Sequence, residues 1–132
     1  MKIAGLSLLL VALCVPAAWA GKAHVLFVEA TQESGDVWTF SVTVKHDDKG
    51  QNHWVDWWRV RTPEGRELGR QVLLHSHEDE QPFTRDERIR IPPNVRSVVV
   101  EAHDKTHGLG GATVTVDLTK PAGQGYTVTR RP

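Results

Sequence analysis

The stretch Asp36–His46, which reads DVWTFSVTVKH, decides the fold class. Its large apolar residues recur at every second position, and threonine, serine or lysine stands between them. Successive side chains of a β-strand point to opposite faces, so this pattern predicts a strand with one buried and one exposed face. The buried face would hold Trp38, Phe40, Val42 and Val44.

The rest of the chain repeats this two-residue period, and no window keeps a helical pattern. We expect six further strands between turns, at residues 24–30, 54–62, 67–75, 88–91, 95–103 and 112–118. Spacing predicts the buried faces of two of them, with Trp54, Trp58 and Val60 on one and Leu68, Val72 and Leu74 on the other. Short strands of this number predict an all-β domain, an immunoglobulin-like β-sandwich of about seven strands.

The beginning of the chain has the pattern of a secretory signal peptide. Lys2 is followed by an apolar run at 6–15 and by Ala18-Trp19-Ala20, a small-x-small peptidase site. We therefore expect a signal peptide at 1–20, a sandwich domain at 21–119 and a tail at 120–132, in which 126–129 is either a short edge strand or loose. The protein would be periplasmic or secreted, with no membrane span after cleavage.

Composition narrows the chemistry. Without residues 1–20 the chain has 15 basic and 16 acidic residues and no cysteine, because Cys14 is the only one. The mature chain therefore has no thiolate for an iron–sulfur cluster, a type 1 copper centre or a cysteine nucleophile. Its balanced charge gives no support for nucleic-acid binding. No Ser-His-Asp arrangement is evident, so the sequence favours a binding protein over an enzyme.

Histidines are concentrated in particular connections. In an immunoglobulin-like sandwich the connections after the second, fourth and sixth strands share one end with the start of the first strand. All seven histidines fall in these segments: His24, His46, His53, His75, His77, His103 and His107. We therefore expect one histidine-rich end.

The pair His75-x-His77 suggests a metal site at that end. Residues two apart on a strand face the same side, with Cα atoms about 6–7 Å apart. The further ligands that we expect are Glu80, His103, Asp104, His107 and His53. Nitrogen and oxygen ligands without thiolate favour copper or zinc, so the predicted function is metal carriage, buffering or sensing. In the alternative interpretation, the imidazoles cap strand ends and bond to carboxylates.

Two other kinds of ligand remain open. The same end, or the face that carries Trp57, would bind an envelope protein or a glycan without metal, with Asp56 and Arg85 as further binding residues. Asp47, Asp48, Asn52 and Asp56 carry the oxygen ligands that calcium prefers, although residues 47–50 read as an ordinary turn. The sequence does not determine the partner or the oligomeric state.

Three segments resemble a family of small exported bacterial proteins: HWVDWWRVRTPEG (53–65), LGRQVLLHSHEDEQPFTR (68–85) and AHDKTHGLGG (102–111). Similar segments of that family read D-H-Y-A-D-x-W, H-P-H-x-x-E-Q-P-F-T-R and A-x-D-x-x-H-G-x-G-G. The resemblance implies shared positions at His53, Asp56, His75, His77, Glu80, Arg85, Asp104 and His107. The chain departs from the pattern at Trp54 and Ser76, where tyrosine and proline are usual. The resemblance implies no activity; the architecture also resembles periplasmic copper carriers of the CopC type, at the level of fold and export only.

Overall fold

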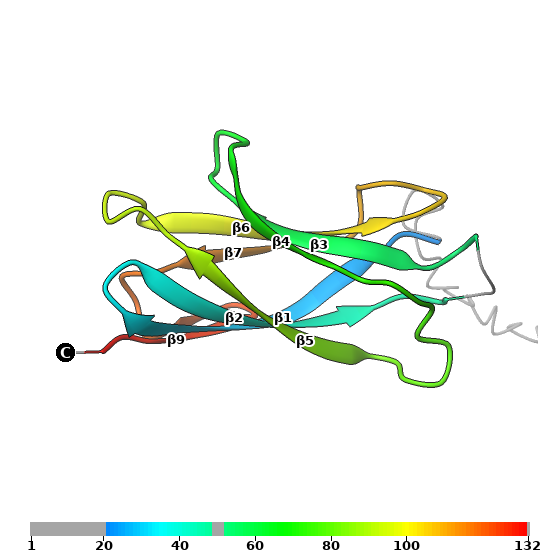
Figure 1. Cartoon of the computed structure of the whole chain (residues 1–132), viewed down its shortest axis with the longest axis horizontal. Helices are drawn as coiled ribbons and strands as arrows, with labels where there is room; N and C mark the ends of the chain where they lie inside the picture. The colour runs from blue at the N-terminus through cyan, green and yellow to red at the C-terminus, as the bar shows by residue number, and fades with distance from the viewer. Residues whose placement is uncertain (1–20, 49–51, 132) are drawn as a thin grey trace, which may run out of the picture.

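The computed structural model describes residues 21–48 and 52–131, which form two stacked β-sheets (Figure 1). The predicted signal peptide lies outside these residues. The described chain is all-β, as predicted, and holds no helix that is long and apolar enough to cross a membrane.

Each sheet is built from strands that are distant in sequence. The first has the order β5-β2-β1-β9-β8, formed by β1 (His24–Ser34), β2 (Val37–Lys45), β5 (Phe83–Arg90), β8 (Ala122–Gly123) and β9 (Tyr126–Thr129). The second has the order β4-β3-β6-β7, formed by β3 (Val55–Arg61), β4 (Glu67–Val72), β6 (Ser97–Asp104) and β7 (Val114–Asp117). The two sheets confirm the predicted sandwich. The fourth strand of an immunoglobulin domain commonly belongs to the same sheet as the first two strands, whereas here β4 lies beside β3 in the other sheet.

The last strand ties the tail to the body. β9 pairs in parallel with β1, so that Val28 lies opposite Tyr126 and Thr31 opposite Thr129. Of the two alternatives left open for residues 126–129, the structure therefore has the strand. Tyr126 and Val128 are buried on its inner side.

The core lies between the sheets and follows the predicted alternation over most of its length. Trp38, Phe40, Val42 and Val44 are all buried along β2, as predicted. Trp58 and Phe83 are fully buried in this core. Burial of such side chains stabilises the fold by about 1.5–3 kcal/mol each.

A β-bulge shifts the phase of β3. The pairing of β3 with β6 slips between Val55 and Trp57, where two residues of β3 oppose one of β6. Val55 is therefore fully buried and Trp54 is only partly buried against the core. The prediction that Trp54 lies fully in the core was wrong, because a bulge breaks the two-residue period.

The region between β4 and β5 also differs from expectation. β4 ends at Val72, and Leu73 turns inward with its N–H bonded to the Asp56 carbonyl at 2.8 Å. Val72 and Leu74 are 58% and 83% exposed, so their predicted core positions were wrong. β5 begins at Phe83 rather than at residue 88. The alternation of its first half is hidden in the sequence because the charged Arg85 and Glu87 share the inward parity of Phe83 and Ile89.

Candidate metal centre

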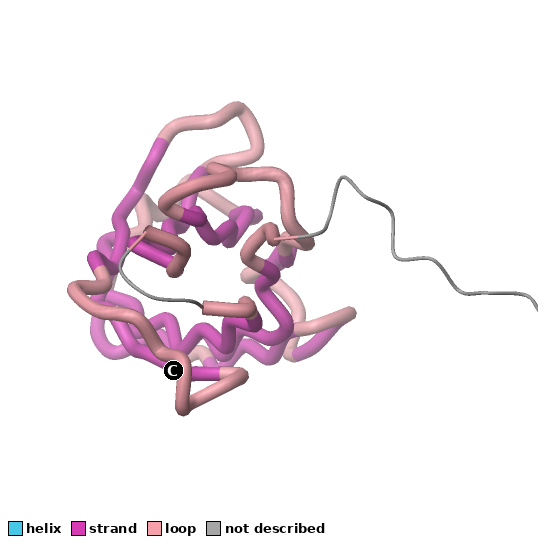
Figure 2. Tube along the Cα trace, turned by 90° about the vertical axis from the view of Figure 1, so that its right-hand side faces the viewer, coloured by secondary structure: helices cyan, strands magenta, loops and turns pink. Residues whose placement is uncertain are grey.

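The histidine-bearing connections meet at one end of the sandwich. In Figure 1 the connections after β2, β4 and β6 and the start of β1 lie on the right, whereas the β1–β2 and β5–β6 turns lie on the left. Figure 2 views the right-hand end, where loops lie in front of the strands. This is the arrangement that the strand count predicted.

Asp104 is the buried anchor of this end. It is the last residue of β6, its side chain is fully buried, and its Oδ1 accepts the backbone N–H groups of Thr106 and His107 at 2.6 Å each. Burial alone would raise the pKa of this carboxyl. The N–H groups of His107 and Thr106 and the nearby His46 outweigh burial and hold the pKa below its ordinary value. Asp104 is therefore a carboxylate in the folded protein.

The second oxygen of Asp104 faces two imidazoles. The Nε2 atom of His46 contacts Oδ2, and the Nε2 atom of His53 lies 3.2 Å from it. Yet Oδ2 is buried, and no hydrogen bond of the described chain reaches it. The three potential ligand atoms all lie within 4.8 Å of one another. His46, His53 and Asp104 could therefore hold a metal ion, and we refer to this candidate site as the metal centre.

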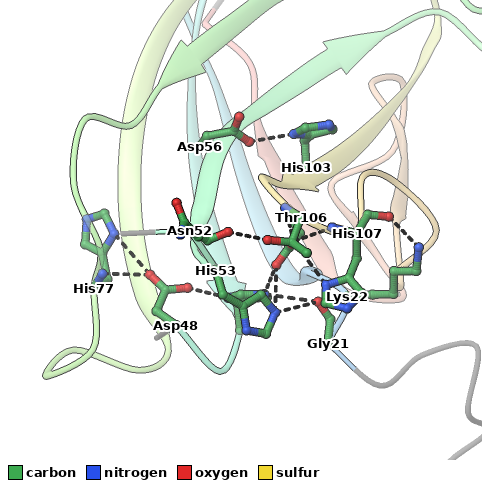
Figure 3. Close-up of polar contacts among 12 residues, drawn as sticks. Gly21, Lys22, Asp48, Asn52, His53, Asp56, His77, His103, Thr106 and His107 are labelled. Carbon is green, nitrogen blue, oxygen red and sulfur yellow. Dashed lines mark hydrogen bonds and ion pairs between the residues drawn. The ribbon is translucent and has the colours of Figure 1, made fainter. Parts of the chain in front are cut away.

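Asp48 orients the buried imidazole of the metal centre. The Nδ1 atom of His46 bonds to Oδ1 of Asp48, which leaves Nε2 directed at Asp104. The second Asp48 oxygen accepts the backbone N–H of His77 at 2.7 Å (Figure 3). At metal sites the far nitrogen of a metal-binding histidine usually bonds to a carboxylate or carbonyl oxygen, which fixes the orientation of the ring. In a neutral ring with its proton on Nδ1, Nε2 is an acceptor. Two acceptors, Nε2 and the Asp104 oxygen, then face each other unless Nε2 also carries a proton or a cation lies between them.

Two more groups border the metal centre. The carbonyl oxygen of Gly21 lies 3.2 Å from Nε2 of His46 and 3.3 Å from Nε2 of His53. The His107 ring lies 4.8 Å from the His53 ring, and its Nδ1 is 3.3 Å from Oδ1 of Asp104. Figure 3 shows Gly21, His53 and His107 grouped together. His107 therefore adjoins the three ligand atoms without sharing the Asp104 Oδ2 oxygen.

The predicted His75 and His77 pair lies to one side. The two ring centroids are 4.7 Å apart, but His77 stacks on Phe83 and its buried Nδ1 has no hydrogen bond in the described structure. Burial lowers the pKa of His77, and Arg85 and His75 add to this effect. His77 connects to the metal centre through Asp48 rather than by contact with its ligand atoms.

Glu80 and Arg85 pair with each other instead of facing the metal centre. Both oxygens of Glu80 accept hydrogen bonds from Arg85, at 3.0 and 3.1 Å. This pairing lowers the pKa of Glu80 and raises that of Arg85. The ion pair closes the loop between β4 and β5.

His103 belongs to a separate cluster on the outer face of β3 and β6. Its Nδ1 lies 2.5 Å from Oδ1 of Asp56, and its ring stacks on Trp57 with centroids 4.5 Å apart. The guanidinium of Arg70 lies 4.2 Å from the centroid of the same indole. Asp56 and Asp48, two of the four residues considered as calcium ligands, thus bond to different histidines.

Sequence reasoning did not include His46 or Gly21 among the ligands. The two-residue period of β2 predicts that His46 faces inward, because His46 continues the series Phe40, Val42 and Val44 past the end of the strand. Asp104 likewise continues the inward positions of β6. A histidine and an aspartate that face inward at the same end of facing sheets must meet in the interior.

The donors suit a first-row transition metal. Two imidazole nitrogens and one carboxylate oxygen, without thiolate, match the ligand preferences of zinc and copper. The fully buried His46 and Asp104 are held by bonds to Asp48 and to the backbone of the loop after β6. A rigid pair with one partly exposed histidine gives a preorganised site that solvent ions can reach.

The chain is similar in sequence to a known protein over about three quarters of its length. A Halomicrobium mukohataei protein named "Putative lipoprotein" is 46% identical to this chain over 101 residues. The match covers 76% of this chain and 50% of that protein, so the chain spans about half the length of its relative. No protein-family profile and no solved structure matches the chain.

Proposed function

We propose that this protein is an exported β-sandwich that binds one copper or zinc ion through His46, His53 and Asp104, and that it carries, buffers or senses that metal. The observation that supports this most is the buried Oδ2 of Asp104, which has no hydrogen bond yet lies against two Nε2 atoms. A buried carboxylate oxygen without a hydrogen bond is costly, and a cation between these three atoms would satisfy all of them.

Export is part of the proposal. It is supported by the signal-peptide pattern at residues 1–20 and by the lipoprotein name of the relative, which describes a protein of the cell envelope. A metal-free function on the Trp57 face receives less support, because His103 and Arg70 already contact that ring. A glycan would have to displace them.

Metal uptake by matched histidine variants tests the proposal. Protein stripped with EDTA is dialysed against Cu(II) or Zn(II), and the wild type is compared with His53→Ala and with His75→Ala. The side chain of His53 is 25% exposed, whereas those of His46 and Asp104 are fully buried, so replacing His53 disturbs packing least among the three. His75 is the control, since it is a histidine at the same end whose ring lies outside the metal centre.

We expect one equivalent of metal in the wild type and in His75→Ala, and at least about tenfold weaker binding in His53→Ala. A free metal concentration of 100 times the Kd would also raise the free energy of unfolding by about 2.7 kcal/mol, which thermal unfolding would detect. Equal uptake by all three proteins would rule out this metal centre, and uptake by none would rule out the function.

A further inference from the structure

The segment that leads into β1 is fixed against the loop after β6. Lys22 Nζ donates to the carbonyl oxygens of His107 at 2.5 Å and of Leu109 at 3.2 Å (Figure 3). The N–H of Val25 bonds to the Ala112 carbonyl at 2.8 Å. Ala23 between them is buried. These contacts hold residues 21–25 in one place beside the metal centre.

Gly21 is the residue of this segment whose backbone lies against the metal centre. Its carbonyl oxygen lies 3.2–3.3 Å from both Nε2 atoms of the metal centre. Its φ is +76°, and a Cβ atom added to it would stand 3.0 Å from Cε1 of His107. Only glycine combines that backbone conformation with that clearance. The site therefore accepts backbone atoms, and no side chain, at position 21.

Gly21 also follows directly after Ala18-Trp19-Ala20, the predicted peptidase site. Hydrolysis of the Ala20–Gly21 peptide bond would leave a carboxylate on Ala20 and a free α-amine on Gly21. We infer that this cleavage completes the metal site, with the Gly21 amine as a further ligand beside His46, His53 and Asp104. The inference rests on the proposed metal-binding function.

The chemistry of the amine explains why cleavage would matter. A peptide nitrogen has its lone pair delocalised into the carbonyl and is a poor donor to a metal, whereas the lone pair of an α-amine is not delocalised in this way. Only Cα and the carbonyl carbon separate the nitrogen of Gly21 from the oxygen that already borders the metal centre. Three nitrogens and one carboxylate oxygen form a set that favours Cu(II) over Zn(II). The uncleaved precursor would bind Cu(II) weakly.

A one-residue insertion tests the inference in the full-length exported protein. One alanine is inserted after Ala20, so that cleavage at the same motif yields a chain beginning Ala-Gly21. The matched control has one alanine added after Pro132. Both are purified after export, their first residue is read from the intact mass, and Cu(II) affinity and electron paramagnetic resonance spectra are measured.

We expect the wild type and the control to start at Gly21, to bind Cu(II) equally and to give one spectrum with three nitrogen ligands. The insertion should bind Cu(II) at least about tenfold more weakly, with a changed spectrum. Equal affinity and identical spectra for insertion and wild type would overturn the amine ligand and leave the metal centre intact. A wild-type chain that starts elsewhere would also overturn it. Failure of all three to bind Cu(II) would overturn the proposed function as well.

Discussion

Replacement of Asp104 separates the two roles that the structure assigns to its carboxylate. Oδ1 accepts two backbone N–H groups at 2.6 Å and shapes the loop after β6, whereas Oδ2 faces His46 and His53. Asp104→Asn keeps an oxygen for the N–H groups and loses the anionic ligand. Asp104→Ala loses both. The two variants should therefore be equally poor in binding metal but unequal in stability.

The size of the stability difference follows from the lost hydrogen bonds. The amide oxygen of Asp104→Asn is neutral, and a hydrogen bond to a neutral acceptor contributes about 0.5–1.5 kcal/mol. Two such bonds would end on it, from Thr106 and His107. Thr106 and His107 are exposed residues, so water replaces part of what Asp104→Ala removes. We expect the metal-free Asp104→Ala protein to be about 1–3 kcal/mol less stable than Asp104→Asn. For a domain of this size, a loss of 2 kcal/mol lowers Tm by roughly 10 °C.

Urea unfolding in EDTA measures the stability difference, and equilibrium dialysis with Zn(II) measures metal binding. Wild-type metal affinity in Asp104→Asn would refute the ligand role of Oδ2. Equal stability of the two variants would refute the role of Oδ1 in holding the loop.

Three further variants test other parts of the structure. Gly111→Ala would place a Cβ 1.8 Å from the Ala23 carbonyl oxygen, so we expect a cost of at least about 1–3 kcal/mol in urea unfolding and weaker metal binding; unchanged stability would contradict the packing. Burial lowers the pKa of His77, so its neutral form stabilises the fold above the ordinary histidine pKa, and this contribution is lost as the pH falls through the lowered value. Metal-free wild type should therefore lose more stability between pH 7.5 and pH 5 than His77→Phe, which keeps the stack on Phe83; equal losses would argue against this titration. His103→Ala should leave metal uptake unchanged in dialysis, because His103 bonds to Asp56 away from the metal centre, and reduced uptake would contradict that separation.

Much of the fold could be predicted because the two-residue period is a local property of each strand. Trp38 to Val44 shows one face without ambiguity, and the turns that flank it mark both ends. The period fails where the backbone departs from regular pairing. Nothing in the residues around Val55 marks the bulge of β3. In β5 the alternation is hidden because the charged Arg85 and Glu87 stand at inward positions between Phe83 and Ile89.

The histidine-rich end could be predicted from strand order, but the partners within it could not. His53, Asp104 and His107 come together, His77 joins them only through Asp48, and His75 and His103 lie elsewhere. The closeness of His75 and His77 in the sequence favoured this pair as metal ligands. The inward parity of His46 and Asp104 was the stronger signal, because it places two polar side chains inside the end of the core. The contribution of Gly21 depends on tertiary contacts that no local pattern contains.

Anomalous diffraction from crystals of metal-loaded protein tests the central claim most directly. Data collected on both sides of the zinc or copper absorption edge locate the ion without any assumption about its ligands. We expect a single peak about 2.0–2.2 Å from Nε2 of His46, Nε2 of His53 and an oxygen of Asp104. A peak between His75 and His77, or no peak in protein loaded at saturating metal, would contradict it.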